Sequence, residues 1–167
     1  PPGITSYAVS DRALGRAADI EERGFLLDLP RAIKDTTAGK TLATPCIPLV
    51  YALQRQLERI ESETLEGRWA RHLRMRDTTL AWAKSRGFVP FVRDEAARSP
   101  TLSCIHARGA DVEAMAVRAA AGGFKLDKGY GMLKGVAFRI GHMGDHSEER
   151  LQQLFDSLAV LGMVIAL

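Results

Sequence analysis

Residues 138–145 read Phe138-Arg139-Ile140-Gly141-His142-Met143-Gly144-Asp145, with a single arginine inside an apolar run that ends in glycines. A buried arginine without an anion beside it is too costly, and its planar guanidinium binds a carboxylate through two parallel hydrogen bonds. The glycines that follow let backbone or ligand come close. We therefore interpret Arg139 as a carboxylate-binding residue on a short strand. A structural ion pair with an acidic residue of the last helix is the alternative.

The composition is that of a globular protein. The chain has 167 residues, of which 46% are hydrophobic and 26% are charged, which predicts one domain or one domain with part of another. The net charge of +3 does not indicate a nucleic-acid partner. Arg68, Arg71 and His72 recur at helical spacing, which is typical of a solvated helix face. Two cysteines and the lack of a membrane-length apolar run favour a cytoplasmic protein without a membrane partner.

The first half of the chain predicts few strands. Residues 3–9 alternate weakly and indicate a strand, and Asp11 is expected to cap a helix that runs to Arg23. Pro30 interrupts any regular pattern in residues 25–34, and residues 35–45 are expected to form a loop. One apolar stripe at three- and four-residue spacing then predicts a long helix; it consists of Ile47, Val50, Leu53, Leu57 and Ile60.

The second half alternates helices and strands. A helix is expected over residues 65–85, with its larger apolar side chains inward: Trp69, Leu73, Leu80 and Trp82. Strands are expected at 88–92, 102–107, 124–126 and 136–140, a helix from Asp111 with Val112, Met115 and Val117, and a last helix capped by Ser147, with Leu151, Leu154, Phe155, Leu158 and Leu161 inward. This order predicts an α+β fold, a small, mostly antiparallel sheet with helices on one face.

Several stretches, in order and at matching spacing, resemble the C-terminal part of class V pyridoxal-phosphate aminotransferases of the alanine/serine–glyoxylate branch. The stretches are Pro1-Pro2-Gly3-Ile4, Thr44-Pro45 with Pro48-Leu49-Val50-Tyr51-Ala52-Leu53, Gly67-Arg68-Trp69-Ala70-Arg71-His72, Arg98-Ser99-Pro100-Thr101, Gly129-Tyr130-Gly131 with Leu133-Lys134-Gly135, and Phe138-Arg139-Ile140-Gly141-His142-Met143-Gly144. The resemblance covers nearly the whole chain.

The resemblance implies a fragment of a larger enzyme of fold type I. Residues 1–45 would be the end of a large α/β cofactor-binding domain with a loop that reaches the partner subunit. Residues 46–167 would be the small C-terminal domain, including the long connecting helix. The family's Schiff-base lysine lies a few residues before the Pro-Pro-Gly, so it is expected outside this sequence. The chain alone is expected to be inactive, and the opening at Pro1 instead of methionine favours a truncation.

The resemblance also implies site residues. Arg139 would hold the substrate α-carboxylate, and Thr44 would contact the phosphate of pyridoxal 5'-phosphate across a homodimer interface. Some members have a tyrosine three residues before that threonine, where this chain has Thr41 as a substitute donor. Thr44 could also simply be a helix N-cap ahead of Pro45, and the two roles are compatible. Gly129-Tyr130-Gly131 is expected to form a turn near the mouth of the active site.

The implied function is transfer of an amino group between alanine or serine and a 2-oxo acid such as glyoxylate or pyruvate. The alternatives are a non-catalytic module that binds small carboxylates and a split enzyme whose lysine-bearing large domain is a companion chain. A cysteine desulfurase relative is less favoured, because Cys104 and Cys46 are expected to be inert core thiols. His142 and His146 mimic a metal pair, but Gly141 and Gly144 argue against the required helix, so no metal site is expected.

Overall fold

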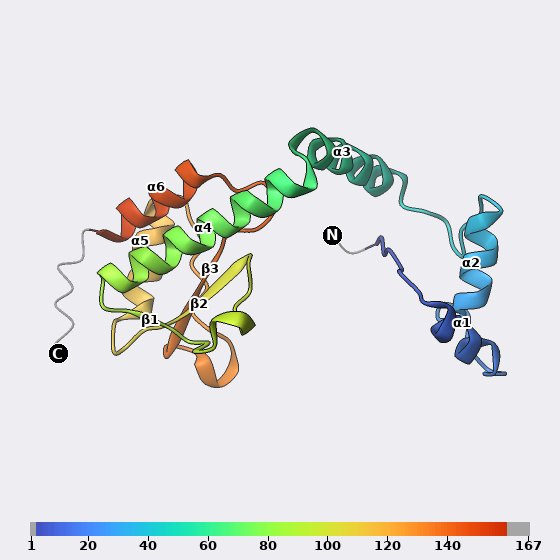
Figure 1. The fold of residues 1–167 in the computed structure, drawn as a ribbon, viewed down its shortest axis with the longest axis horizontal. Coiled ribbons are helices and arrows are strands. Elements are labelled where there is room, and N and C mark those ends of the chain that lie inside the picture. Colours follow the sequence, from blue (N-terminus) through green and yellow to red (C-terminus); the bar gives the residue numbers. More distant parts are fainter. Residues whose placement is uncertain (1–2, 160–167) are drawn as a thin grey trace. The chain divides into compact units, whose positions relative to one another are not determined.

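The chain divides into two compact units between Ser62 and Glu63. Figure 1 shows the computed structural model, which describes residues 3–159. Three residues named in the sequence predictions lie outside the described residues: Pro1 and Pro2 of the first motif, and Leu161 of the last helix. The predicted domain boundary between residues 45 and 46 concerns the complete protein, and it stays a prediction.

The first unit contains three helices: α1 (Asp11–Ala18), α2 (Leu29–Thr37) and α3 (Ile47–Glu63), whose last residue already belongs to the second unit. The N-cap of α1 is Ser10 and not Asp11, because the Ser10 hydroxyl accepts a hydrogen bond from the Ala13 amide. The expectation that Pro30 breaks the pattern is wrong. Pro30 stands in the first turn of α2, where no intrahelical N–H bond is lost.

Two further expectations for the first unit have different outcomes. The long helix predicted from the apolar stripe is confirmed as α3. The strand predicted for residues 3–9 is wrong, because the described part of that segment is irregular. A strand needs a partner for its backbone hydrogen bonds, and none of the described strands pairs with this segment.

The second unit is the α+β layer that the sequence predicts. A three-stranded sheet in the order β1-β2-β3 is antiparallel throughout, and helices α4, α5 and α6 lie on one side of it (Figure 1). The bounds are α4 (Leu65–Ser85), β1 (Val89–Pro90), β2 (Leu102–His106), α5 (Val112–Ala121), β3 (Ala137–Gly141) and α6 (Glu148–Ala159), with single 3-10 turns at Glu95–Ala97 and Gly131–Leu133.

The core lies between the sheet and these helices. Phe138 and Ile140 of β3 and Ile105 of β2 are buried there together with side chains of α4, α5 and α6, among them Met75, Met115 and Leu154. Side chains alternate between the two faces of a strand. Arg139 therefore lies on the opposite face of the sheet from Phe138 and Ile140.

The inward faces of two helices differ from the predicted ones. In α4, Trp69 and Leu73 are exposed, and the buried stripe consists of His72, Met75, Thr79 and Ala83. In α5, Val117 is exposed, whereas Val112 and Met115 are buried as expected. Trp82 does pack inward and stacks on Phe155 of α6 at a centroid distance of 4.7 Å.

Candidate active site

Arg139 is held by a bidentate ion pair with Asp127. The Arg139 Nε lies 2.9 Å from Asp127 Oδ1, and the Arg139 Nη2 lies 2.6 Å from Asp127 Oδ2. The alternative prediction is an ion pair between Arg139 and an acidic residue of the last helix. An ion pair does form, but the predicted partner is wrong, because Asp127 lies in the segment between α5 and β3. Both side chains keep part of their surface, 37% for Arg139 and 43% for Asp127. The guanidinium can therefore reach a ligand.

The backbone brings this pair together. The Arg139 amide donates to the Asp127 carbonyl oxygen at 3.0 Å, and the two residues form an isolated antiparallel bridge beside β3. The predicted strand at 124–126 is wrong, since only this bridge at Asp127 forms. The Gly129 amide donates to Asp127 Oδ1 at 2.9 Å, so a turn on the Gly129-Tyr130-Gly131 motif fixes the carboxylate.

The charges of the pair stabilise each other. The hydrogen bonds from Arg139 are the main cause that lowers the pKa of Asp127, and the same bonds raise the pKa of Arg139. Both groups are therefore ionised at neutral pH, and Arg139 keeps its positive charge for an incoming anion.

Cys104 lies beside Arg139 on the open face of the sheet. The two residues are direct partners in the register of β2 and β3, and Cys104 is half-buried. Partial burial is the main cause that raises the pKa of this thiol, against the opposing charge of Arg139. The protonated thiol is a poor nucleophile, which supports an unreactive cysteine. The expected core position is wrong for both cysteines, because Cys104 is half-buried and Cys46 is exposed.

A cavity of about 290 Å³ is lined by residues of β3, α6 and the segment before Asp127. Its polar lining is basic, with Lys125, Arg139, His146 and Arg150, and no aspartate or glutamate is among its lining residues. The apolar lining residues include Leu126 and Ile140. A cavity with both basic and apolar lining favours a small anion with an apolar part.

The two threonines proposed for the cofactor phosphate lie in the first unit. Thr44 and Thr41 are both exposed. Helix α3 begins at Ile47, so Thr44 stands two residues before its N-cap position and is not the cap. The Thr41 hydroxyl donates to the Ala43 carbonyl oxygen at 2.7 Å, and it would have to release this bond to donate to a phosphate.

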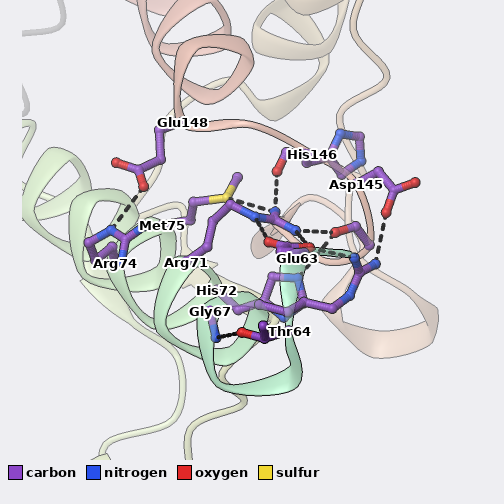
Figure 2. A network of polar contacts seen from close by, with 12 residues as sticks. Glu63, Thr64, Gly67, Arg71, His72, Arg74, Met75, Asp145, His146 and Glu148 are labelled. Atoms are coloured by element: carbon purple, nitrogen blue, oxygen red, sulfur yellow. Dashed lines mark hydrogen bonds and ion pairs between the residues drawn. The ribbon is translucent and has the colours of Figure 1, made fainter. Parts of the chain in front are cut away.

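An ion-pair network ties the start of α4 to the loop after β3 (Figure 2). Glu63 accepts from Arg71 Nε at 2.6 Å and from Arg68 Nη1 at 2.8 Å, and Arg68 Nη2 reaches Asp145 at 2.9 Å. Arg71 also donates to the backbone carbonyl oxygens of His146 and Gly144. Arg68 and Arg71 are only 11% and 17% exposed, so the predicted solvated helix face is wrong.

This network fixes the loop that begins directly after the Arg139 strand. His72 is buried, and its Nε2 lies 3.2 Å from the Gly144 carbonyl oxygen. The helical spacing of Arg68, Arg71 and His72 was visible in the sequence. The acidic partners of the two arginines do not stand at helical spacing from them: Glu63 lies five residues before Arg68, and Asp145 lies in a distant segment. Spacing alone therefore does not identify them.

The metal pair at His142 and His146 does not form. His142 is fully buried with its Nε2 3.0 Å from the Ser103 hydroxyl, whereas His146 is exposed. Among residues 3–159, no group of three or more His, Cys, Asp or Glu side chains could hold a metal ion. Across the same residues, no helix combines the length and hydropathy of a membrane span.

Comparison with known proteins places these features in a family. A serine–glyoxylate aminotransferase of Arabidopsis thaliana is 33% identical over 99% of this chain. The crystal structure of an alanine–glyoxylate aminotransferase from Nostoc sp. superposes with a TM-score of 0.79 at 27% identity over 89% of this chain. The chain is a relative of the alanine/serine–glyoxylate aminotransferases. The resemblance to this class V pyridoxal-phosphate family is confirmed.

This aminotransferase relative spans about two fifths of the proteins it matches, 41% of the Arabidopsis protein and 41% of the Nostoc chain. That share is consistent with a C-terminal domain. A protein of Synechococcus named as the small subunit of a soluble hydrogenase is also similar, at 32% identity over 86% of this chain and 38% of its own length. No family model matches the sequence.

Proposed function

We propose that the complete protein is a pyridoxal-phosphate-dependent transaminase that moves an amino group between L-alanine or L-serine and glyoxylate or pyruvate. In this proposal Arg139 binds the substrate α-carboxylate. The protein works as a homodimer in the cytoplasm, and its large domain with the cofactor-linked lysine lies on the same chain or on a companion chain.

The observation that carries the proposal is the state of Arg139. Its guanidinium is ionised, partly open to solvent and held on the face of the sheet opposite the buried Phe138 and Ile140, in a chain whose relatives include serine– and alanine–glyoxylate aminotransferases. These substrates share an α-carboxylate, and the planar guanidinium matches this group. The basic lining of the neighbouring cavity adds attraction for anions.

Arg139 would orient the substrate as well as bind it. A carboxylate held by two parallel hydrogen bonds cannot rotate freely, so the bonds at the adjacent carbon point in fixed directions. When bound, the cofactor supplies the electron sink for amino-group transfer. Orientation by Arg139 selects which bond at that carbon reacts.

Thr44 fits the cofactor phosphate better than Thr41. An exposed hydroxyl and backbone N–H groups just before a helix are suitable donors to a phosphate, and Thr44 is exposed and lies three residues before the start of α3 at Ile47. The hydroxyl of Thr41 already donates to Ala43. We therefore assign Thr44 to the phosphate contact and give Thr41 a secondary role.

The test is amino transfer by the complete protein, from L-alanine or L-serine to glyoxylate or pyruvate, compared with its Arg139→Ala variant. A charged hydrogen-bond pair contributes about 1.5–3 kcal/mol, so kcat/KM for the amino acid should fall roughly 10- to 150-fold. Arg118→Ala, on α5 at the helix-covered side of the sheet, is the matched control and should change little.

Unchanged KM values in Arg139→Ala would contradict the assignment of Arg139. If the complete protein transfers no amino group but still binds pyruvate through Arg139, the proposal of a transaminase fails and the carboxylate-binding module is favoured.

A further inference from the structure

Asp127 occupies only one edge of the Arg139 guanidinium. The hydrogen bonds to Asp127 come from Nε and Nη2. Among residues 3–159, none accepts a hydrogen bond from Nη1 of Arg139. An arginine has five N–H donors in a fixed fork, so the end formed by Nη1 and Nη2 remains able to bind a second carboxylate.

The Asp127 carboxylate is itself fixed by backbone. Its Oδ1 accepts from the Gly129 amide at 2.9 Å, and its own carbonyl oxygen accepts from the Arg139 amide at 3.0 Å. The turn that provides the Gly129 amide has no freedom to accept a side chain there. A Cβ at Gly129, whose φ is +83°, would lie 2.2 Å from the Leu133 carbonyl oxygen.

The Gly129 amide therefore holds the Asp127 carboxylate in place, and this carboxylate holds the Arg139 guanidinium. An arginine side chain loses about 2 kcal/mol of rotamer entropy when it is fixed. Asp127 fixes it before any ligand arrives, so a ligand does not have to do so.

We infer that Asp127 is a positioning residue that holds the Nε edge of Arg139 so that the free end of the guanidinium faces the substrate carboxylate. The inference rests on the proposed function, because it assigns to Asp127 a part in substrate recognition through Arg139. The substrate class that this arrangement would bind is a small 2-amino or 2-oxo acid whose carboxylate meets the free end of the Arg139 guanidinium.

Other charged groups near the pair do not replace Asp127. Lys125 adds a positive charge near Asp127. Lys128 is paired with Glu113 through both carboxylate oxygens, at 2.9 and 2.8 Å. Cys104, on the other side of Arg139, keeps its proton because burial raises its pKa.

The experiment is a double-mutant cycle in the complete protein with Asp127→Asn, Arg139→Ala and the double variant. Asparagine keeps an oxygen for the Gly129 amide and removes the charge and the acceptor for Nη2. We expect Asp127→Asn to raise the KM for L-serine or L-alanine about tenfold, with kcat changed less than twofold. In the Arg139→Ala background the same change should have less than a twofold effect, because Asp127 acts through Arg139.

Two controls separate this role from a structural one. Glu113→Gln removes an exposed acidic partner from the same region and should leave KM unchanged. Asp127→Glu restores the charge and should recover part of the loss.

Two results would overturn the inference. A lower KM in Asp127→Asn would show that Asp127 competes with the substrate for Arg139. Equal effects of Asp127→Asn in both backgrounds would show a purely structural role in the turn. If the complete protein does not transfer amino groups, the proposed function fails separately. The same cycle, read as the dissociation constant of pyruvate by calorimetry, then decides the role of Asp127.

Discussion

The two units of the chain use the same apolar helical pattern with opposite results. In α6 of the second unit, Leu151, Leu154, Phe155 and Leu158 are all buried. In α3, assigned almost entirely to the first unit, Ile47, Val50, Leu53 and Leu57 are all exposed, from 37% to 55%. None of the described residues in α1, α2 or α3 is buried. Hydrophobic periodicity therefore identifies a helix and its apolar face, but it does not identify what covers that face.

The comparison predicts very different costs for the same kind of truncation. Phe138→Ala removes a fully buried ring of the second unit and should lower the free energy of unfolding by about 3–5 kcal/mol. Leu57→Ala removes a 55% exposed side chain of α3 and should cost less than about 0.5 kcal/mol. Urea denaturation of the 167-residue chain measures both. Equal losses would mean that α3 is covered in solution, and the contrast between the units would be lost.

The second prediction uses a histidine inside the better-packed unit. Burial is the main cause that lowers the pKa of His142 from 6.5 to about 4, and His72 and Arg76 add to it. Within residues 3–159 its Nδ1 has no hydrogen-bond partner. The unfolded chain therefore takes up a proton between pH 6.5 and 4 and the folded chain does not. Stability should fall by roughly 3 kcal/mol as the pH drops through this window.

Denaturation at several pH values between 4 and 7 measures this loss. His142→Gln should remove the loss of stability at low pH, whatever its effect at neutral pH. His106→Gln, at a half-buried position of β2, should keep that loss. A wild-type chain of constant stability down to pH 4.5 would contradict the buried, neutral state of His142.

The third and smallest effect concerns Glu63, the first residue of the second unit. Glu63→Gln removes the charge that pairs with Arg68 and Arg71 and should cost about 1–3 kcal/mol. Hydrogen bonds from Arg71 are the main cause that lowers the pKa of Glu63. Its contribution is therefore fully present above about pH 4.3 and is lost as the pH falls through the lowered folded-state value.

Thermal unfolding at pH 7 and pH 3 checks this prediction, with the exposed Glu61→Gln as the matched control. The difference between the two variants should be present at pH 7 and smaller at pH 3, because Glu63 begins to take up a proton at low pH. A Glu63 variant as stable as the control at pH 7 would show that the network contributes specificity of packing and little stability.

Much of the second unit could be predicted from the sequence. The α+β fold is confirmed, since β2, β3 and α4 begin and end within about two residues of the predicted limits, and Ser147 does accept from the Arg150 amide at the start of α6. Local signals suffice here because capping residues and alternation act over a few residues.

The parts that could not be predicted depend on distant partners. Nothing in the spacing of Asp127 indicates that it meets Arg139, twelve positions away, because a backbone bridge brings them together. The same holds for Arg68, whose partner Asp145 lies 77 positions away. The exposure of Trp69 and Val117 was missed for a related reason, since apolar size does not decide which side of a helix meets the core.

The Gly129 turn has a consequence for mutational tolerance. A substitution at this position would force a Cβ against the Leu133 carbonyl oxygen, and the support of Asp127 would be lost with the turn. A saturation scan of the gene would therefore mark position 129 as indispensable, with the profile expected of a catalytic residue. The intolerance would come from the shape of the main chain, because a glycine has no side chain with which to touch a substrate.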